Sequence, residues 1–233
     1  MKNEEENKTF LFVSSKRLVI VVKDKDKKDL FKKELLIENN LKSLDLDIIK
    51  EFINKNIFDI EKKVNHFINN IFLIIDNDNF LSIDLSIKRN MSYEKINIKV
   101  VNNLLIDAKE QCKKTLENYE IIHMTIKKYF IDNLSFLLLP KDIVCNNLSL
   151  HINFICLPKN YVKDLENILK SYQISLNRII SYNYLVDFLD KDQSDIFTLG
   201  EKILNGYNQN EVLLVNKTQK NTGIFEKFFN FFN

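Results

Sequence analysis

Residues 119–156 read YEIIHMTIKKYFIDNLSFLLLPKDIVCNNLSLHINFIC, and this stretch decides how the rest of the chain is organised. Two apolar runs flank a polar segment that contains Pro140. In the second run apolar and polar residues alternate, which is the period of a strand with one buried face. The apolar face carries Leu148, Leu150, Ile152, Phe154 and Cys156, and the polar face carries Ser149, His151 and Asn153. The pattern predicts a half-buried strand.

The composition describes a globular chain of 233 residues, with 45% hydrophobic and 28% charged residues. A net charge of +2 gives no electrostatic reason to expect nucleic acid as a partner. With three glycines, the chain has no glycine-rich phosphate loop. The three cysteines lack CxxC spacing, so we expect reduced thiols.

Upstream of the opening stretch, the period of the apolar residues changes twice. Residues 57–71 have helical spacing. The apolar run 71–75, the turn residues 76–79 and the alternating run 81–87 together predict a hairpin. Residues 104–116 return to helical spacing.

Downstream, Pro158 marks the start of a predicted helix that reaches Leu169. A strand at Ile174–Ile180 and a helix at Tyr182–Leu189 follow. This mixed order predicts an α/β chain with α+β character in two lobes, one inserted in the other.

Spacing argues against the candidate chemical sites. His151 and Cys156 lie five residues apart on one predicted strand, so they fall on opposite faces and cannot form a nucleophile pair. The histidines at 66, 123 and 151 lack metal-ligand spacing. Asp76 and Asp78 begin like a calcium loop but lack its glycine and closing glutamate. We expect no catalytic residue, no cofactor and no metal.

The opening stretch resembles the bacterial cell-division protein family FtsA, a divergent branch of the actin-like superfamily. The resemblance rests on His123 in an apolar strand, the Tyr129–Asp132 segment, Pro140, Leu148 and His151, in that order. It implies half of an actin-like fold with an inserted strand–helix–strand–strand (SHS2) subdomain. In this family SHS2 docks neighbouring division proteins and subunits.

The resemblance also implies a domain plan. Residues 8–90 and 159–190 would form the first actin-like subdomain, and residues 91–158 would form SHS2. Residues 191–222 would be a linker, and residues 223–233 an amphipathic membrane-targeting helix.

The chain departs from the family at the first phosphate loop, where FtsA-like proteins have Asp-x-Gly-Thr. The matching positions are Phe12, Val13, Ser14 and Ser15. The carboxylate that would organise a hydrated metal ion is replaced by Phe, and the glycine by Ser. The roughly 40 residues after position 190 leave no room for the second half of the fold. We therefore expect no ATPase activity, and contact with FtsZ is in doubt because the family binds FtsZ through that half.

The last residues resemble the membrane-targeting end of FtsA-like proteins. As a helix they would group apolar side chains on one broad face, which suits the surface of a bilayer. The candidate membrane-binding residues are Ile224, Phe225, Lys227, Phe228, Phe229, Phe231 and Phe232. Lys217, Lys220 and Lys227 could each add about 1 kcal/mol of attraction to anionic lipid. A terminal helix that docks on the protein's own core is the alternative.

The resemblance thus implies a divisome assembly protein that is not an enzyme and lies on the inner face of the cytoplasmic membrane at the division site. Its partners would be other division proteins, bound through the exposed face and edge strand of SHS2, with self-association as a further option. Three alternatives remain open. They are an SHS2-containing adaptor of a pilus or secretion apparatus as in PilM-like proteins, an ATP-binding actin-like protein, and an unrelated α+β binding module.

Overall fold

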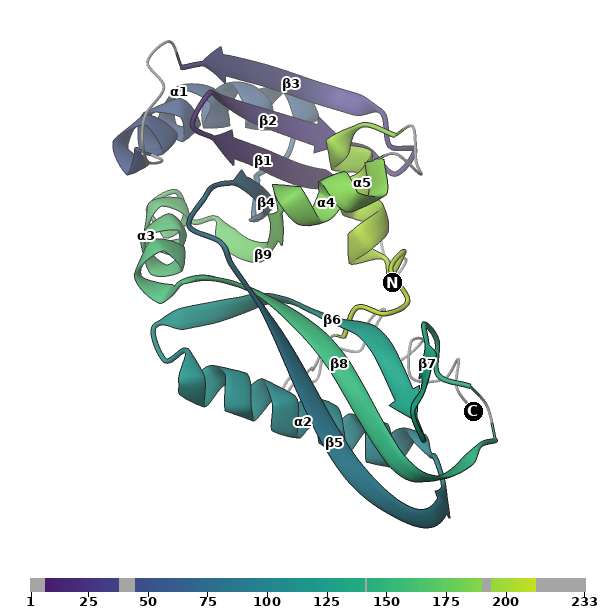
Figure 1. The fold of residues 1–233 in the computed structure, drawn as a ribbon. Helices are drawn as coiled ribbons and strands as arrows, with labels where there is room; N and C mark the ends of the chain where they lie inside the picture. Colours follow the sequence, from purple (N-terminus) through teal and green to yellow (C-terminus); the bar gives the residue numbers. More distant parts are fainter. Residues whose placement is uncertain (1–6, 38–44, 141, 190–193, 213–233) are drawn as a thin grey trace.

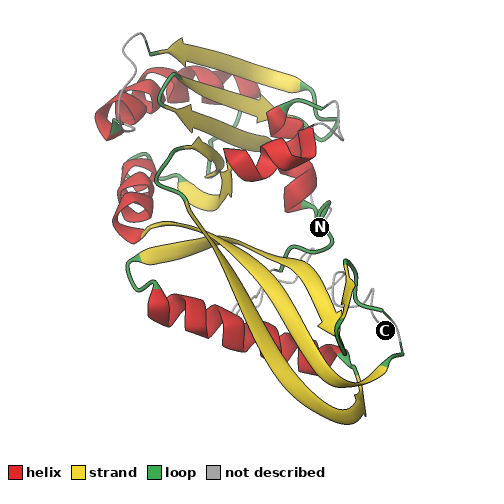
Figure 2. Cartoon of the chain, viewed as in Figure 1, coloured by secondary structure: helices red, strands yellow, loops and turns green. Residues whose placement is uncertain are grey.

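The computed structural model describes residues 7–37, 45–140, 142–189 and 194–212, which form two lobes (Figures 1 and 2). The strands are β1 (Lys8–Ser14), β2 (Arg17–Lys23), β3 (Asp29–Leu36), β4 (Asn70–Asp76), β5 (Leu81–Lys95), β6 (Tyr119–Ile131), β7 (Leu134–Phe136), β8 (Val144–Pro158) and β9 (Ser175–Ser181). The helices are α1 (Leu46–Val64), α2 (Ile98–Thr115), α3 (Lys159–Lys170), α4 (Tyr182–Leu189) and α5 (Ile196–Leu204). The prediction of a mixed α/β chain is confirmed.

Lobe 1 is built on a five-stranded sheet in the order β3-β2-β1-β4-β9. The strands β1, β4 and β9 run parallel, whereas β2 and β3 join as antiparallel neighbours. Helices α1 and α3 pack on one face, and α4 and α5 pack on the other. Because both faces are covered, the central strands read as nearly continuous apolar runs.

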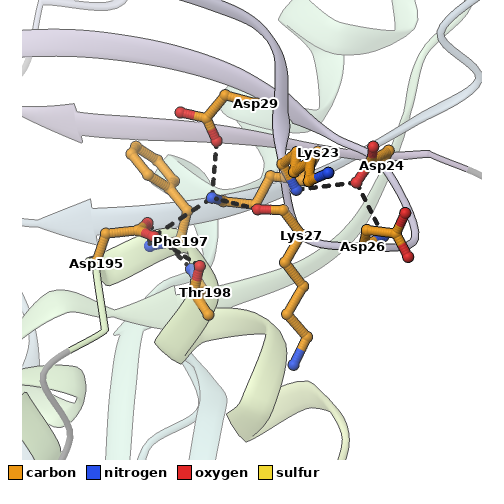
Figure 3. A network of polar contacts seen from close by, with 9 residues as sticks. Lys23, Asp24, Asp26, Lys27, Asp29, Asp195, Phe197 and Thr198 are labelled. Carbon is orange, nitrogen blue, oxygen red and sulfur yellow. Dashed lines mark hydrogen bonds and ion pairs between the residues drawn. The ribbon is translucent and has the colours of Figure 1, made fainter.

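A buried lysine of lobe 1 pairs with the carboxylate at the start of helix α5 (Figure 3). Lys23 Nζ lies 2.7 Å from Asp29 Oδ1 and 3.3 Å from Asp195 Oδ2. Asp195 also caps α5, because its carboxylate accepts hydrogen bonds from the N–H groups of Phe197 and Thr198. Burial lowers the pKa of Lys23, but hydrogen bonds and attraction from the two carboxylates outweigh burial and raise it overall.

Lobe 2 is a four-stranded antiparallel sheet in the order β5-β8-β6-β7, with α2 packed against one face. Along the chain this lobe is built in the order β5, α2, β6, β7 and β8. The predicted half-buried strand is β8, and its apolar face is confirmed. The residues on that face are Leu148, Leu150, Ile152, Phe154 and Cys156, all 0% exposed.

The predicted hairpin over residues 71–87 is wrong. Strand β4 lies in lobe 1 between β1 and β9, whereas β5 lies in lobe 2 beside β8. The physical reason is visible in the residue patterns. β4 is apolar on both faces and suits a sheet covered twice, whereas β5 alternates and suits a sheet covered once.

Two predicted domain limits fall inside ordered elements. Residue 91, the expected start of SHS2, lies within β5, which begins at Leu81. The expected linker 191–222 contains α5, which buries Phe197, Leu199 and Ile203 against lobe 1.

Candidate interaction surface

Strand β5 forms an outer edge of the lobe 2 sheet (Figure 1). It pairs with β8 from Leu81 opposite Cys156 to Asn90 opposite Asn147, and resumes after a bulge at Glu94. Among the described residues no strand pairs with its other side. Its outward N–H and C=O groups are therefore available to an added strand.

The exposure of β5 follows from this position. Leu85 and Ile87 pack into the core that β8 shares with α2 but stay only half-buried, whereas Leu150 and Ile152 of β8 on the same face are fully buried. A central strand is flanked on both sides, and an edge strand on one. A strand added to β5 would therefore cover apolar surface as well as satisfy the backbone.

The opposite face of this sheet is polar, and hydrogen bonds align its side chains. Asn153 Nδ2 donates to Ser82 Oγ and to Asp84 Oδ1, at 2.9 Å each. The hydroxyls of Ser86 and Ser149 lie 3.2 Å apart. The side chains of the β5 edge are thus partly ordered before any partner arrives.

The other edge of the sheet is covered by the chain itself. Strand β7 pairs with the end of β6. Residues 208–212, which we name the strap, run beside the earlier part of β6. The N–H of Ile126 donates to the Asn210 carbonyl at 2.9 Å, and the N–H of Val212 donates to the Met124 carbonyl at 2.8 Å.

The strap carries Glu211 into the seam between the lobes, where three side chains hold its carboxylate. His123 Nδ1 of lobe 2 lies 2.7 Å from Oε1. Two residues of lobe 1 complete the group, since Arg178 pairs with Oε1 and the Tyr184 hydroxyl donates to Oε2 at 3.2 Å. Both His123 and Glu211 are almost completely buried. The Glu211 carboxylate therefore contacts side chains of both lobes.

The backbone around the seam sets the tautomer of His123. The N–H of Ser181 donates to Nε2 at 3.1 Å, so Nε2 is unprotonated and Nδ1 carries the hydrogen donated to Glu211. Burial lowers the pKa of His123, which favours the neutral ring. Burial alone would raise the pKa of Glu211. Hydrogen bonding to His123 and attraction by Arg178 outweigh burial and lower that pKa.

Of the four positions compared above with a phosphate loop, Phe12, Val13 and Ser14 are the last residues of β1, and Ser15 begins the short turn to β2. The Ser14 hydroxyl oxygen accepts hydrogen bonds from the N–H groups of Lys16 and Arg17, at 3.3 and 3.0 Å. Those N–H groups are therefore already satisfied. Phe12 is 2% exposed and packs edge-on against Tyr182, with ring centroids 5.5 Å apart.

His151 and Cys156 lie on opposite faces of β8 and do not form a nucleophile pair. His151 is on the polar face of β8, 4.0 Å from Asp84, whereas Cys156 is buried on the α2 face, as predicted. Burial and the neighbouring Cys112 raise the pKa of Cys156 to about 12, which suppresses the thiolate. The part of the chain that is described holds no cluster of three or more metal-ligating side chains.

The predicted membrane-binding residues lie outside the described residues. They are Ile224, Phe225, Lys227, Phe228, Phe229, Phe231 and Phe232. None of the helices described in the structure is long and apolar enough to cross a membrane.

Sequence reasoning missed the seam. Glu211, Arg178 and Tyr184 lie in separate segments of the chain, and no motif or spacing connects them to His123. The one local signal was that Val212 opens a short apolar run, which indicates burial at this point rather than a linker.

No protein-family model matches the chain, and no curated protein sequence is similar enough to count as a relative. Solved structures with a similar fold include the PilM–PilN type IV pilus biogenesis complex, with TM-score 0.46 and 8% identity over 76% of this chain and 48% of that one. The cytoplasmic domain of EpsL, an inner membrane component of the type II secretion system of Vibrio cholerae, has TM-score 0.36 and 9% identity over 77% of this chain and 57% of that one. A Bacteroides thetaiotaomicron protein with an actin-like ATPase fold has TM-score 0.32 and 14% identity over 81% and 57%. This chain thus spans about half the length of the proteins it resembles.

Proposed function

We propose that this chain is a non-catalytic assembly protein that holds division proteins at the inner face of the cytoplasmic membrane. The observation that carries the proposal is the open edge of β5. It combines backbone groups that no described strand pairs with, half-buried apolar side chains and an aligned polar face on one lobe. Such an edge suits a partner that binds by adding a strand.

The seam supports a passive role for the joint between the lobes. Nucleotide-driven proteins of two-lobed architecture close and open around their ligand. Here Glu211 is bonded to both lobes at once, and the strap is paired with β6 by backbone hydrogen bonds. A rigid joint presents lobe 2 in one orientation, which suits a scaffold.

The β1–β2 turn supports function without ATP. A phosphate loop binds its ligand through unpaired backbone N–H groups. In this turn the N–H groups of Lys16 and Arg17 are occupied by Ser14, and Phe12 stands where the family has a carboxylate.

Membrane attachment is assigned to the Phe-rich end of the chain, with Phe228 and Phe232 among its apolar residues. The strap supports this assignment by its position. Its last residue, Val212, is hydrogen-bonded to Met124 of lobe 2, so the described part of the chain ends beside the docking lobe. One short helix binds a bilayer weakly, which favours assemblies of several copies.

The test is the location of a fluorescently tagged chain in its native cell, with and without residues 223–233. We expect a midcell band that is lost on deletion of these residues. Flotation with anionic liposomes should likewise depend on them, whereas the unfolding midpoint should stay nearly unchanged. A band elsewhere on the envelope would contradict the division role and favour a pilus or secretion adaptor. A large loss of stability would show that the tail is part of the core.

A further inference from the structure

The regular part of β5 has a self-complementary pattern of charge. Asp84 and Lys88 lie on the same polar face, two residues on either side of Ser86. Both are exposed. An antiparallel copy of the same strand, centred on Ser86, would therefore place each Asp84 directly opposite Lys88 of the second copy.

We propose that β5 pairs with β5 of a second copy of this chain, antiparallel and centred on Ser86, so that two lobe 2 sheets become one continuous sheet. The inference rests on the proposed function and deepens it: the strand that the open β5 edge receives is β5 of a second copy, so division proteins would bind the exposed polar face of lobe 2 instead of this edge. The interface is isologous, with a two-fold axis through the paired Ser86 residues.

The rest of the strand fits this register. On the polar face Ser82 meets Asn90 of the second copy. On the face toward α2, Leu85 meets Ile87 of the second copy, and both of these side chains are left half-buried by the open edge. Ile83 meets the long apolar stem of Arg89. The pairing thus adds apolar contact where the single copy lacks it.

Neighbouring registers fit less well. Centring on Asp84 sets two carboxylates opposite each other, and centring on Lys88 does the same with two ammonium groups, which is unfavourable. Centring on Leu85 places Asp84 opposite Ser86 and leaves the charges unmatched. The bulge also limits the strand, because regular pairing with β8 stops at Asn90 and the backbone is left-handed at Ser92 and Tyr93. The Ser86 register uses Ser82 to Asn90 and stops before the bulge.

Charge exchange tests the pairing. The dimer dissociation constants of the full chain and of its variants are measured without lipid, by sedimentation velocity over a wide range of concentration. We expect a reversible dimer, and Lys88→Glu should raise its dissociation constant about tenfold or more because two like-charge pairs replace two opposite ones. The double variant D84K/K88E restores opposite charges and should return the constant to near the original value. Lys99→Glu on α2, the same charge change on an exposed residue outside β5, should have little effect.

Crosslinking tests the register. In Ser86→Cys the two thiols face each other across the axis, so mild oxidation should give a covalent dimer. Ser82→Cys lies on the same face and is exposed, but its partner is Asn90, so it should crosslink far less. The native Cys112, Cys145 and Cys156 are buried and should not interfere.

A chain that stays monomeric at all concentrations, a double variant that fails to restore pairing, or equal crosslinking at 82 and 86 would overturn the inference. These outcomes are separate from failure of the proposed function, since membrane binding is read by flotation. We expect Lys88→Glu to float with anionic liposomes through its intact tail.

Discussion

His123 of lobe 2 and Glu211 of the strap are 88 residues apart in the chain, yet Nδ1 of one lies 2.7 Å from Oε1 of the other. The same Glu211 oxygen is paired with Arg178 of lobe 1. One buried carboxylate is therefore the point at which both lobes and the C-terminal strap meet.

Replacing Glu211 by Ala should cost about 3 kcal/mol of unfolding free energy. The substitution leaves Arg178, 17% exposed, without its carboxylate partner and removes the acceptor for His123. Denaturant unfolding followed by circular dichroism measures the loss. Glu166→Ala is the matched control, because its pair with Lys170 is solvent-exposed and should contribute less than about 0.5 kcal/mol. Equal losses in the two variants would refute the role of the seam.

Stability should fall as the solution becomes mildly acidic. The pKa of buried His123 is lowered from its ordinary 6.5, so the unfolded chain takes up a proton before the folded one does. The contribution of neutral His123 to the free energy of unfolding is present above pH 6.5, and it is lost as the pH falls from there toward the lowered pKa. The slope approaches at most about 1.4 kcal/mol per pH unit. Glu211, whose pKa is lowered from 4.5, keeps its contribution until the pH falls below that value.

Unfolding free energies measured between pH 8 and pH 5 test whether His123 causes the first loss of stability on acidification. His123→Gln should be less stable at pH 8 and should show a flatter dependence on pH, because the titrating ring is gone. An unchanged slope in this variant would assign the acid sensitivity to other groups.

The two strands of the opening stretch could be predicted because their signals are local. In β8 the alternation from Leu148 to Cys156 is complete, and one residue of slip would turn every apolar side chain to solvent. The mixed α/β character followed in the same way from helical and strand periods along the chain.

The error at residues 71–87 shows where local signals end. Two strand-like runs joined by turn residues predict a hairpin, but β4 is a parallel partner of β1 and β9, which lie far away in the sequence. The turn residues between the two runs do not indicate whether the runs pair with each other or with distant strands. Glu211 was missed for a similar reason, since a single carboxylate in a polar segment does not reveal that it will be buried.

Mg-ATP should not bind at micromolar concentration. The N–H groups of Lys16 and Arg17 are satisfied by the Ser14 hydroxyl, and Phe12 offers no ligand for a hydrated metal ion. Isothermal titration of the full chain measures this directly, and the unfolding midpoint should stay the same with and without Mg-ATP. Micromolar binding would refute our interpretation of the turn and favour an ATP-dependent protein.

Asp195 serves helix α5 in two ways, and two substitutions separate them. It caps the helix through the N–H groups of Phe197 and Thr198, and it pairs with buried Lys23 (Figure 3). Asp195→Asn keeps a side-chain oxygen that can cap the helix, so it should lose only the weak, half-exposed ion pair, less than about 1 kcal/mol. Asp195→Ala removes both functions and should cost about 1–2 kcal/mol. Urea unfolding of the two variants gives the difference. If the two substitutions cost the same, the ion pair with Lys23, rather than the cap, holds α5 on lobe 1.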